Sequence, residues 1–219
     1  MKISSLLVRP EQNPIESAQG YVLRLADLNG LRHSRWLFAH LGIKPFAIAA
    51  MCPLCLAENS VWRRAWLDRR RPWCPDHRCW LVDGCTVCGQ ALRWVHLRRA
   101  QCACGAVLAE TAVLPAPADL MRFIDIDPAA TEALLWLGAI AQFGIQGKPW
   151  KCCAHERVAE RAHMLCTGWA MNANWPAAFF ECLDHQRQNS RPMSAQLLSD
   201  AFPAVMRQVQ RIKAAPWRA

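Results

Sequence analysis

Apolar side chains recur at helical spacing in two short stretches near the N-terminus. In the first stretch they lie at Ala18, Tyr21, Val22, Leu25 and Leu28. This spacing predicts a helix that begins after an N-cap at Ser17 and ends at Asn29-Gly30. In the second stretch, which begins at about Ser34 and ends at Gly42, one face carries Trp36, Leu37, His40 and Leu41. Two short helices joined by a glycine-containing turn fit a helix-turn-helix element and a plain helical hairpin equally well.

Helical periodicity stops at about residue 50 and returns after a Pro/Ala linker at 114–118. The residues between, 50–110, are rich in Cys, Trp and Arg, as in small loop-and-hairpin units that metals hold together. Beyond the linker, helical spacing is found at 129–143, 155–171, 175–188 and 203–213. We therefore expect a mainly α protein with small β/loop fingers, built from an N-terminal helical part (1–49), a finger region (50–110) and a C-terminal helical region (119–219).

Composition narrows the class of protein. Of the 219 residues, 53% are hydrophobic and 20% are charged, which suits a chain with a buried core and excludes a disordered polar one. The longest apolar run, 133–141, spans about nine residues, whereas a membrane-spanning helix needs about 20. The first residues lack the long apolar stretch and the cleavage site of a secretory signal. We expect a cytoplasmic protein with no membrane partner.

Positive charge is concentrated in one part of the chain. The formal net charge is +9, and residues 61–100 hold nine Arg against three Asp, which is +6 of that total. A localised basic segment indicates a polyanionic partner more strongly than a generally basic surface does.

The spacing of the cysteines predicts two metal sites. A reducing compartment disfavours a disulfide framework for the twelve cysteines. The first predicted ligand set is Cys52, Cys55, Cys74 and His77, and the second is Cys85, Cys88, Cys102 and Cys104. Two thiolates on one tight turn grip one side of a tetrahedral ion, and a pair returning after a loop supplies the other side. Soft sulfur ligands favour zinc, so we expect two structural Zn²⁺ ions in tandem zinc ribbons.

Several alternatives to these ligand sets stay open at this stage. The cysteines of 52–104 could be reduced core residues, and a single CxxC is also typical of redox pairs. Cys79 and His96 are spare donors that could replace an assigned ligand, although a small buried Cys79 is the simpler interpretation. Cys152, Cys153, Cys166 and Cys182 lie in the C-terminal helical region without a CxxC pair, and with His155 or His163 they could build another site. Isolated cysteines in helical regions are more often core residues, so we assign these no role.

Arginines and tryptophans alternate around the predicted metal ligands. The candidate nucleic-acid-binding residues are Arg63, Arg64, Arg69, Arg70, Arg71, Arg98 and Arg99. Guanidinium groups bind phosphate through paired hydrogen bonds, and Trp faces can stack on bases. The alternatives are a solvated arginine surface or one that docks an acidic protein, and tryptophans that fill a small core.

The order of these motifs resembles the TniQ/TnsD family of transposition proteins. The N-terminal part of the resemblance is Pro14-Ile15-Glu16-Ser17, followed by Tyr21, Arg24 and Asn29-Gly30 and ending at His40-Leu41-Gly42. Its zinc-finger part is Cys52-Pro53-x-Cys55, Trp66, Cys74-Pro75-x-His77 and Cys85-x2-Cys88-Gly89. Leu137-Gly138 and Trp175-Pro176 resemble the segment that follows, so the resemblance covers most of the chain.

The resemblance implies a function that spacing alone does not give. Members of the family are non-catalytic adaptors that choose insertion sites. They link target DNA, a recombination site or an RNA-guided CRISPR effector to an AAA+ ATPase regulator, which recruits the transposase. It also implies that the 14–42 helices form the helix-turn-helix or partner-binding part. Whether the chain forms a homodimer stays open.

Two other classes of function compete with the adaptor. One is a stand-alone zinc-ribbon regulator that binds nucleic acid by itself. The other is a nuclease, for which Asp125, Asp127, Glu156 and Glu160 are the available carboxylates. No His or Lys accompanies them convincingly, so a helix cap or a solvated face is the favoured interpretation.

Overall fold

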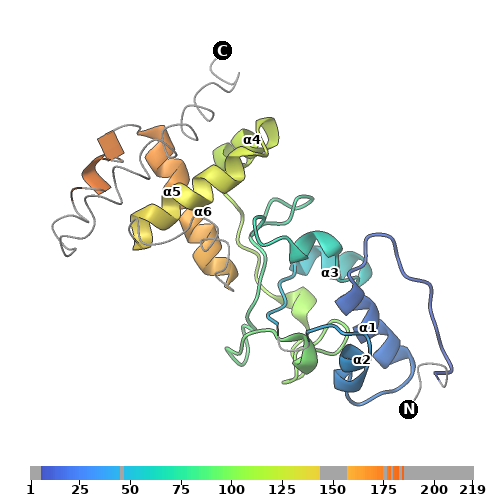
Figure 1. The fold of residues 1–219 in the computed structure, drawn as a ribbon. Coiled ribbons are helices and arrows are strands. Elements are labelled where there is room, and N and C mark those ends of the chain that lie inside the picture. Colours follow the sequence, from blue (N-terminus) through green and yellow to red (C-terminus); the bar gives the residue numbers. More distant parts are fainter. Residues whose placement is uncertain are drawn as a thin grey trace. The chain divides into compact units, whose positions relative to one another are not determined.

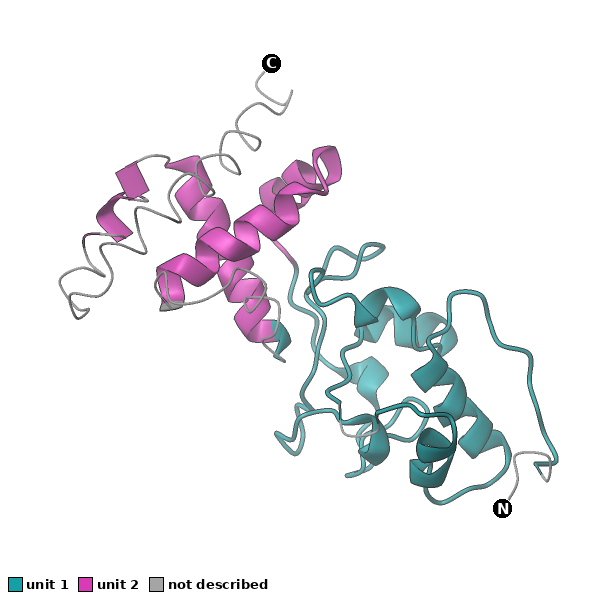
Figure 2. Ribbon diagram, viewed as in Figure 1, with its two compact units in different colours: residues 1–115, 156–158 teal, residues 116–155, 159–219 magenta. Residues whose placement is uncertain are grey.

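The computed structural model describes residues 6–44, 47–143 and 157–174, together with 177, 178, 180–182 and 184. The chain divides into two compact units (Figure 2), one formed by Met1–Pro115 with Glu156–Val158 and the other by Ala116–His155 with Ala159–Ala219. The first boundary falls inside the Pro/Ala segment 114–118. Each unit is described by itself.

The first unit contains short helices joined by long loops (Figure 1). Its α-helices are α1 (Ala18–Leu28), α2 (Arg35–His40) and α3 (Pro53–Asn59), and its 3-10 turns are η2 (Arg64–Leu67), η3 (Trp94–His96) and η4 (Leu108–Glu110). The predictions of the first two helices are confirmed. The loop prediction for 50–110 was wrong at α3, because this helix is only seven residues long and so shows no readable periodicity.

The finger region lacks the regular strands that β hairpins would supply. Among the described residues of the unit, antiparallel pairing is limited to isolated bridges such as Met51↔Val82, Trp73↔Trp80 and Gly84↔Ala91. Each bridge fixes one crossing of two loops. The region is therefore mainly loops and short helical turns, held together by side chains more than by backbone ladders.

The start of α1 is fixed by two buried polar side chains. Ser17 is fully buried, and its hydroxyl accepts a hydrogen bond of 3.0 Å from the backbone N–H of Gly20, as the sequence predicted for an N-cap. Glu16, only 1% exposed, forms a paired contact with Arg24: Oε1 accepts from Nε at 3.0 Å and Oε2 accepts from an Nη at 2.6 Å. This carboxylate raises the pKa of the Arg24 guanidinium.

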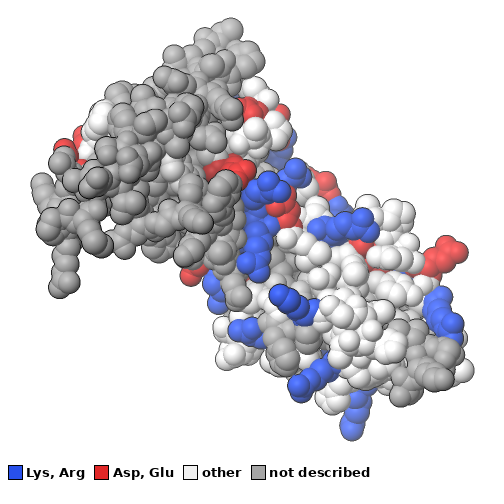
Figure 3. Space-filling view, in the orientation of Figure 1, with Lys and Arg blue, Asp and Glu red and all other residues white. Residues whose placement is uncertain are grey.

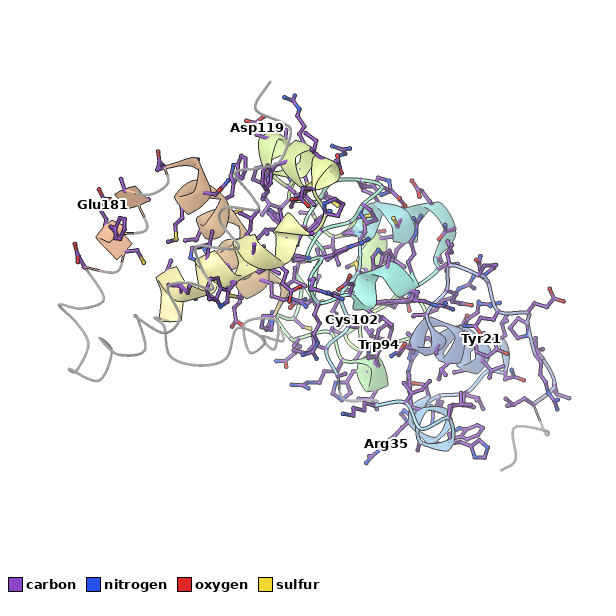
Figure 4. The ribbon with its side chains drawn as sticks, turned by 45° about the horizontal axis from the view of Figure 1, so that its top comes forward. Tyr21, Arg35, Trp94, Cys102, Asp119 and Glu181 are labelled. Carbon is purple, nitrogen blue, oxygen red and sulfur yellow. The ribbon has the colours of Figure 1, made fainter. Side chains whose placement is uncertain are left out.

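Backbone pairing ties the N-terminal helix to the finger region. The N–H of Ser17 donates to the carbonyl of Trp62 at 2.8 Å, and the N–H of Arg64 donates to Ile15 at 2.8 Å. Behind this crossing, the Trp62 ring meets Trp94 edge-on at 4.8 Å between centroids and Trp66 at 6.1 Å. Helices α1 and α2 and the cysteine-rich loops thus share one hydrophobic core. In Figure 4 the labelled Trp94 lies inside the unit, whereas Arg35 of α2 lies at its rim.

The second unit is helical in its described part. It contains α4 (Ala118–Ile126), α5 (Ala130–Phe143) and α6 (Val158–Ala173). The first residue of α6, Val158, is assigned to the first unit. The predictions of helices at 129–143 and 155–171 are confirmed, and α4 was missed. A Cβ on Gly138 would lie 1.8 Å from the carbonyl oxygen of Met164, so α5 and α6 cross with backbones in contact.

The structure describes only part of the remaining predicted helices. In 175–188 the described residues 177, 178, 180–182 and 184 are helical, and 203–213 lies outside the described residues. Within the part of the chain that the structure describes, no helix combines the length and the apolar character that crossing a membrane requires.

Gly20 allows α1 to pack on Trp62, and this contact can be tested. A Cβ at Gly20 would lie 2.5 Å from the Cβ of Trp62. Gly20→Ala gains about 1 kcal/mol of helix propensity but overpacks a buried contact at a cost of about 1–3 kcal/mol. We expect a net loss of up to about 2 kcal/mol in the free energy of unfolding, measured by urea titration of tryptophan fluorescence. Gln19→Ala, next to it on the same helix and only half-buried, should not lose stability.

Candidate metal centres

The first cluster is assembled from a helix N-terminus and a tight turn. Cys52 is the N-cap residue of α3, Pro53 follows in its first turn, and Cys55 lies one turn along. Pro53 suits this place because a first-turn residue needs no N–H partner. Opposite, the N–H of Cys74 donates to Cys79 at 2.7 Å and the N–H of Arg78 donates back to Cys74 at 2.9 Å. This turn directs Cys74 and His77 toward the cysteines of α3.

The four ligand atoms of the first cluster have the spacing of a tetrahedral metal site. The Cys55 and Cys74 sulfurs are 3.5 Å apart. His77 Nδ1 lies 3.2 Å from Cys55 Sγ, 3.6 Å from Cys52 Sγ and 3.8 Å from Cys74 Sγ. Ligand sulfurs about 2.3 Å from one tetrahedral ion are about 3.8 Å from each other. All four atoms lie within 4.8 Å of one another, so this cluster could hold a metal ion.

The thiols of this cluster affect each other's pKa, so that one ionises more readily and its neighbours less readily. The interaction with Cys52 lowers the pKa of the Cys74 thiol to about 5, and the same interaction together with burial raises the pKa of Cys52. Burial is also the main cause that raises the pKa of Cys55 to about 12. Several thiolates at this spacing inside a core require a nearby cation. A dication at the centre of the cluster would supply it.

Glu58 orients the imidazole of the first cluster. While His77 Nδ1 faces the cysteines, its Nε2 lies 2.9 Å from Oε1 of Glu58. The contact with Cys74 is the main cause that raises the pKa of His77, and the contact with Glu58 raises it further. A carboxylate on the outer nitrogen of a ligand histidine fixes the ring and its tautomer. Glu58 is held in turn by Arg63, which also pairs with Asp76. The spacing of residues in the sequence gave no sign that Glu58, which lies 19 residues before His77, would contact it.

Cys79, one of the spare donors, lies beside the first cluster but outside its four-atom set. It is buried, and its sulfur is 3.5 Å from that of Cys52. Burial is the largest of the influences that raise the pKa of Cys79. A neutral thiol that packs behind a ligand sulfur, rather than replacing it, is consistent with this position.

The second cluster is formed by two similar turns. The N–H of Gly89 donates to Cys85 at 2.9 Å, and the N–H of Gly105 donates to Cys102 at 2.9 Å. Both glycines have positive φ, 70° and 91°, which lets the chain reverse directly after each ligand pair. In the first cluster the corresponding place is taken by Arg78, with φ 48°.

The geometry of the second cluster matches the first. The Cys85 and Cys104 sulfurs are 3.7 Å apart, and those of Cys88 and Cys102 are 3.8 Å apart. The backbone N–H of Cys88 is the main cause that lowers the pKa of Cys85 to about 7. Cys85 and Cys102 are buried, whereas Cys88 and Cys104 reach solvent. This cluster too could hold a metal ion, and none of its cysteines is paired in a disulfide.

The candidate arginines fall into two groups. Arg63 is largely covered, with 16% of its side chain exposed, and is ion-paired to Glu58 and Asp76. Most of the others are exposed: Arg64, Arg69, Arg70, Arg71 and Arg98. Arg99 is half-buried, and its Nη1 lies 3.6 Å from Asp27. Figure 3 shows basic side chains spread over the visible face of the first unit rather than gathered at one point.

The tryptophans near these arginines belong to the core. Trp62, Trp66, Trp73, Trp80 and Trp94 are each at most 9% exposed. This agrees with the core-filling interpretation and removes their faces from base stacking.

The remaining sequence candidates do not form a further cluster among the described residues. His96 is exposed and lines a hollow of about 310 Å³ beside the second cluster. Asp127 accepts the N–H of Ala129 at 3.1 Å, which is a cap just before α5. Cys166 and Cys182 are partly buried and are not in a disulfide. Cys152, Cys153, His155 and Glu156 lie outside the described residues.

Comparison of the chain with protein-family models, curated proteins and solved structures finds no match.

Metal content tests both clusters together. We expect two metal ions per chain by elemental analysis, and one after Cys55→Ser, because three donors no longer fill a tetrahedron. Cys79→Ser should retain two ions. Chelation should unfold the first unit, seen as red-shifted tryptophan fluorescence, because such metals contribute on the order of 10 kcal/mol to folding. Full tryptophan burial in a metal-free chain would contradict this.

Glu58 should affect metal affinity without being a ligand. Glu58→Ala removes the carboxylate on His77 Nε2, so we expect metal to bind about 10–100-fold more weakly at the first site, measured by competition with a chromophoric chelator. Glu58→Gln, which keeps an acceptor, should lose less. Asp76→Asn is the matched control, since Asp76 contacts Arg63 but not the ring. Equal losses in Glu58→Ala and Asp76→Asn would indicate a general charge effect instead.

Proposed function

We propose that this protein is a non-catalytic adaptor for target-site selection in DNA transposition. It links target DNA, or an RNA-guided targeting complex, to an AAA+ ATPase regulator that recruits the transposase. The observation that carries the proposal is the pair of four-donor clusters, formed by the residues that also carry the resemblance to the TniQ/TnsD proteins. In the same unit, the resembling Glu16 and Ser17 hold the start of α1.

The metal in both clusters is proposed to be zinc, with a structural role. Three thiols with one imidazole, and four thiols, are the donor sets of structural zinc. Four protein donors leave no coordination position for water or substrate, so neither ion would activate a nucleophile. Cys52, Cys55, Cys74 and His77 would hold one ion, and Cys85, Cys88, Cys102 and Cys104 the other.

The exposed arginines would form the docking surface. Arg69, Arg70 and Arg71 follow η2 on a loop that leads directly into Cys74, so the first zinc site fixes where they are presented. Arg70 and Arg71 each have about half or more of the side chain exposed, and both lie near Asp68. Helices α1 and α2 are proposed to serve as the helix-turn-helix or partner-binding element.

A stand-alone zinc-ribbon regulator is the second candidate. The exposed Arg64 and Arg98 favour it as much as they favour an adaptor, because contact with phosphate is common to both. The two functions differ in whether an ATPase is needed for stable binding at a target.

Reconstitution separates the two candidates. The full chain is mixed with an AAA+ ATPase regulator of transposition, ATP and duplex DNA, and complexes are resolved by size-exclusion chromatography. We expect the chain to co-elute with the ATPase on DNA. The triple variant Arg69→Gln, Arg70→Gln, Arg71→Gln should bind DNA more weakly, with a salt slope shallower by up to about 0.9 per lost phosphate contact.

Arg122→Gln, an exposed arginine of the second unit, is the matched control. Tight sequence-specific binding by the chain alone, with no retention of the ATPase, would assign the regulator function. A magnesium-dependent cleavage activity lost in Asp125→Asn would contradict both.

A further inference from the structure

A polar hollow of about 340 Å³ lies between α1, the turn into α2 and the Leu97–Arg99 loop. Its charged lining residues are Arg32, Arg98, Arg99 and Asp27. Three guanidinium groups against one carboxylate leave two positive charges. Leu23 and Leu97, both buried, supply part of the apolar lining.

The polar atoms that a ligand in this hollow can meet are those of its exposed arginines. Arg32 and Arg98, which lie on opposite sides of the hollow, are exposed. Two other polar atoms of the lining residues, Ser34 Oγ and Arg99 Nε, have no hydrogen-bond partner among the described residues, but both are closed off from solvent. The guanidinium groups of Arg32 and Arg98 are therefore the donors that face the hollow.

The backbone on both sides of the hollow is held firmly. The N–H groups of Arg98 and Gln101 each donate to the other residue's carbonyl, at 3.0 and 2.7 Å, which closes a two-residue turn at Arg99-Ala100. The buried Trp62 donates its indole N–H to the carbonyl of Arg99. Across the hollow, the N–H of Leu31 donates to Ala26 at 2.9 Å, which fixes the chain before Arg32. The guanidinium groups of Arg32, Arg98 and Arg99 therefore extend from backbone that is fixed before any ligand arrives.

We propose that this hollow binds one phosphodiester group of a nucleic-acid backbone. Guanidinium groups match the two non-bridging oxygens of a phosphate. The net charge of the lining suits an anion, and its volume exceeds what a single carboxylate side chain fills. The site joins α1 and α2 to the finger loops in one contact and rests on the proposed nucleic-acid role.

The test is binding of a fluorescein-labelled 20-base-pair duplex to the full chain, followed by anisotropy at several salt concentrations. Because Arg98 and Arg99 would share one phosphate, each variant, Arg98→Gln and Arg99→Gln, should weaken binding about tenfold, and the double variant should lose little more. The salt slope should fall by about 0.9 in the double variant, not by twice that.

Arg122→Gln is the charge-matched control, and two bound metal ions per chain verify that each variant is folded. Pocket variants that bind the duplex as Arg122→Gln does, while the Arg69–Arg71 variant weakens, would overturn this inference and leave the proposed function intact. Loss of ATPase binding without any change in duplex binding would also overturn it, by assigning the hollow to an acidic protein side chain. A wild-type chain that binds neither duplex nor ATPase would overturn both proposals.

Discussion

Mutual repulsion among buried thiolates is the constraint on which the first unit depends. Cys52, Cys55 and Cys74 lie in the interior with His77, and their spacing is that of ligands around one ion. Without a cation, burial and mutual interaction keep most of these thiols protonated, as the raised pKa values of Cys52 and Cys55 indicate. A dication bound there would turn the repulsion into attraction, and it would link Cys55 of α3 to Cys74 across the 18 residues between them.

The rest of the unit is built around that constraint because regular backbone pairing is sparse. Its described loops meet only through isolated bridges, so the chain between them is positioned by the two cysteine-rich clusters and by large side chains. Trp62 shows how the two combine: its ring packs on Trp94, its carbonyl holds the start of α1, and its indole N–H holds the Arg99 turn. One residue thereby connects the N-terminal helices with the basic loops.

Features set by short-range chemistry were predictable from the sequence. The CxxC and CPxH spacings predicted both clusters because ligand pairs on tight turns need fixed local separations, and Ser17 followed by an apolar period predicted the start of α1. Helix α3 was missed because its first residues are ligands and a proline rather than a periodic face. The role of Glu58 could not be predicted, since it depends on His77, a residue 19 positions away that folding brings near.

Charge counting along the sequence overstated the basic surface, and the structure shows which arginines were overcounted. Arg63 is used internally, between Glu58 and Asp76, and so supports the first cluster instead of facing a ligand. Arg99 is partly neutralised by Asp27, yet it retains a buried Nε without an acceptor. Position rather than number therefore distinguishes the arginines that face solvent from those used within the fold.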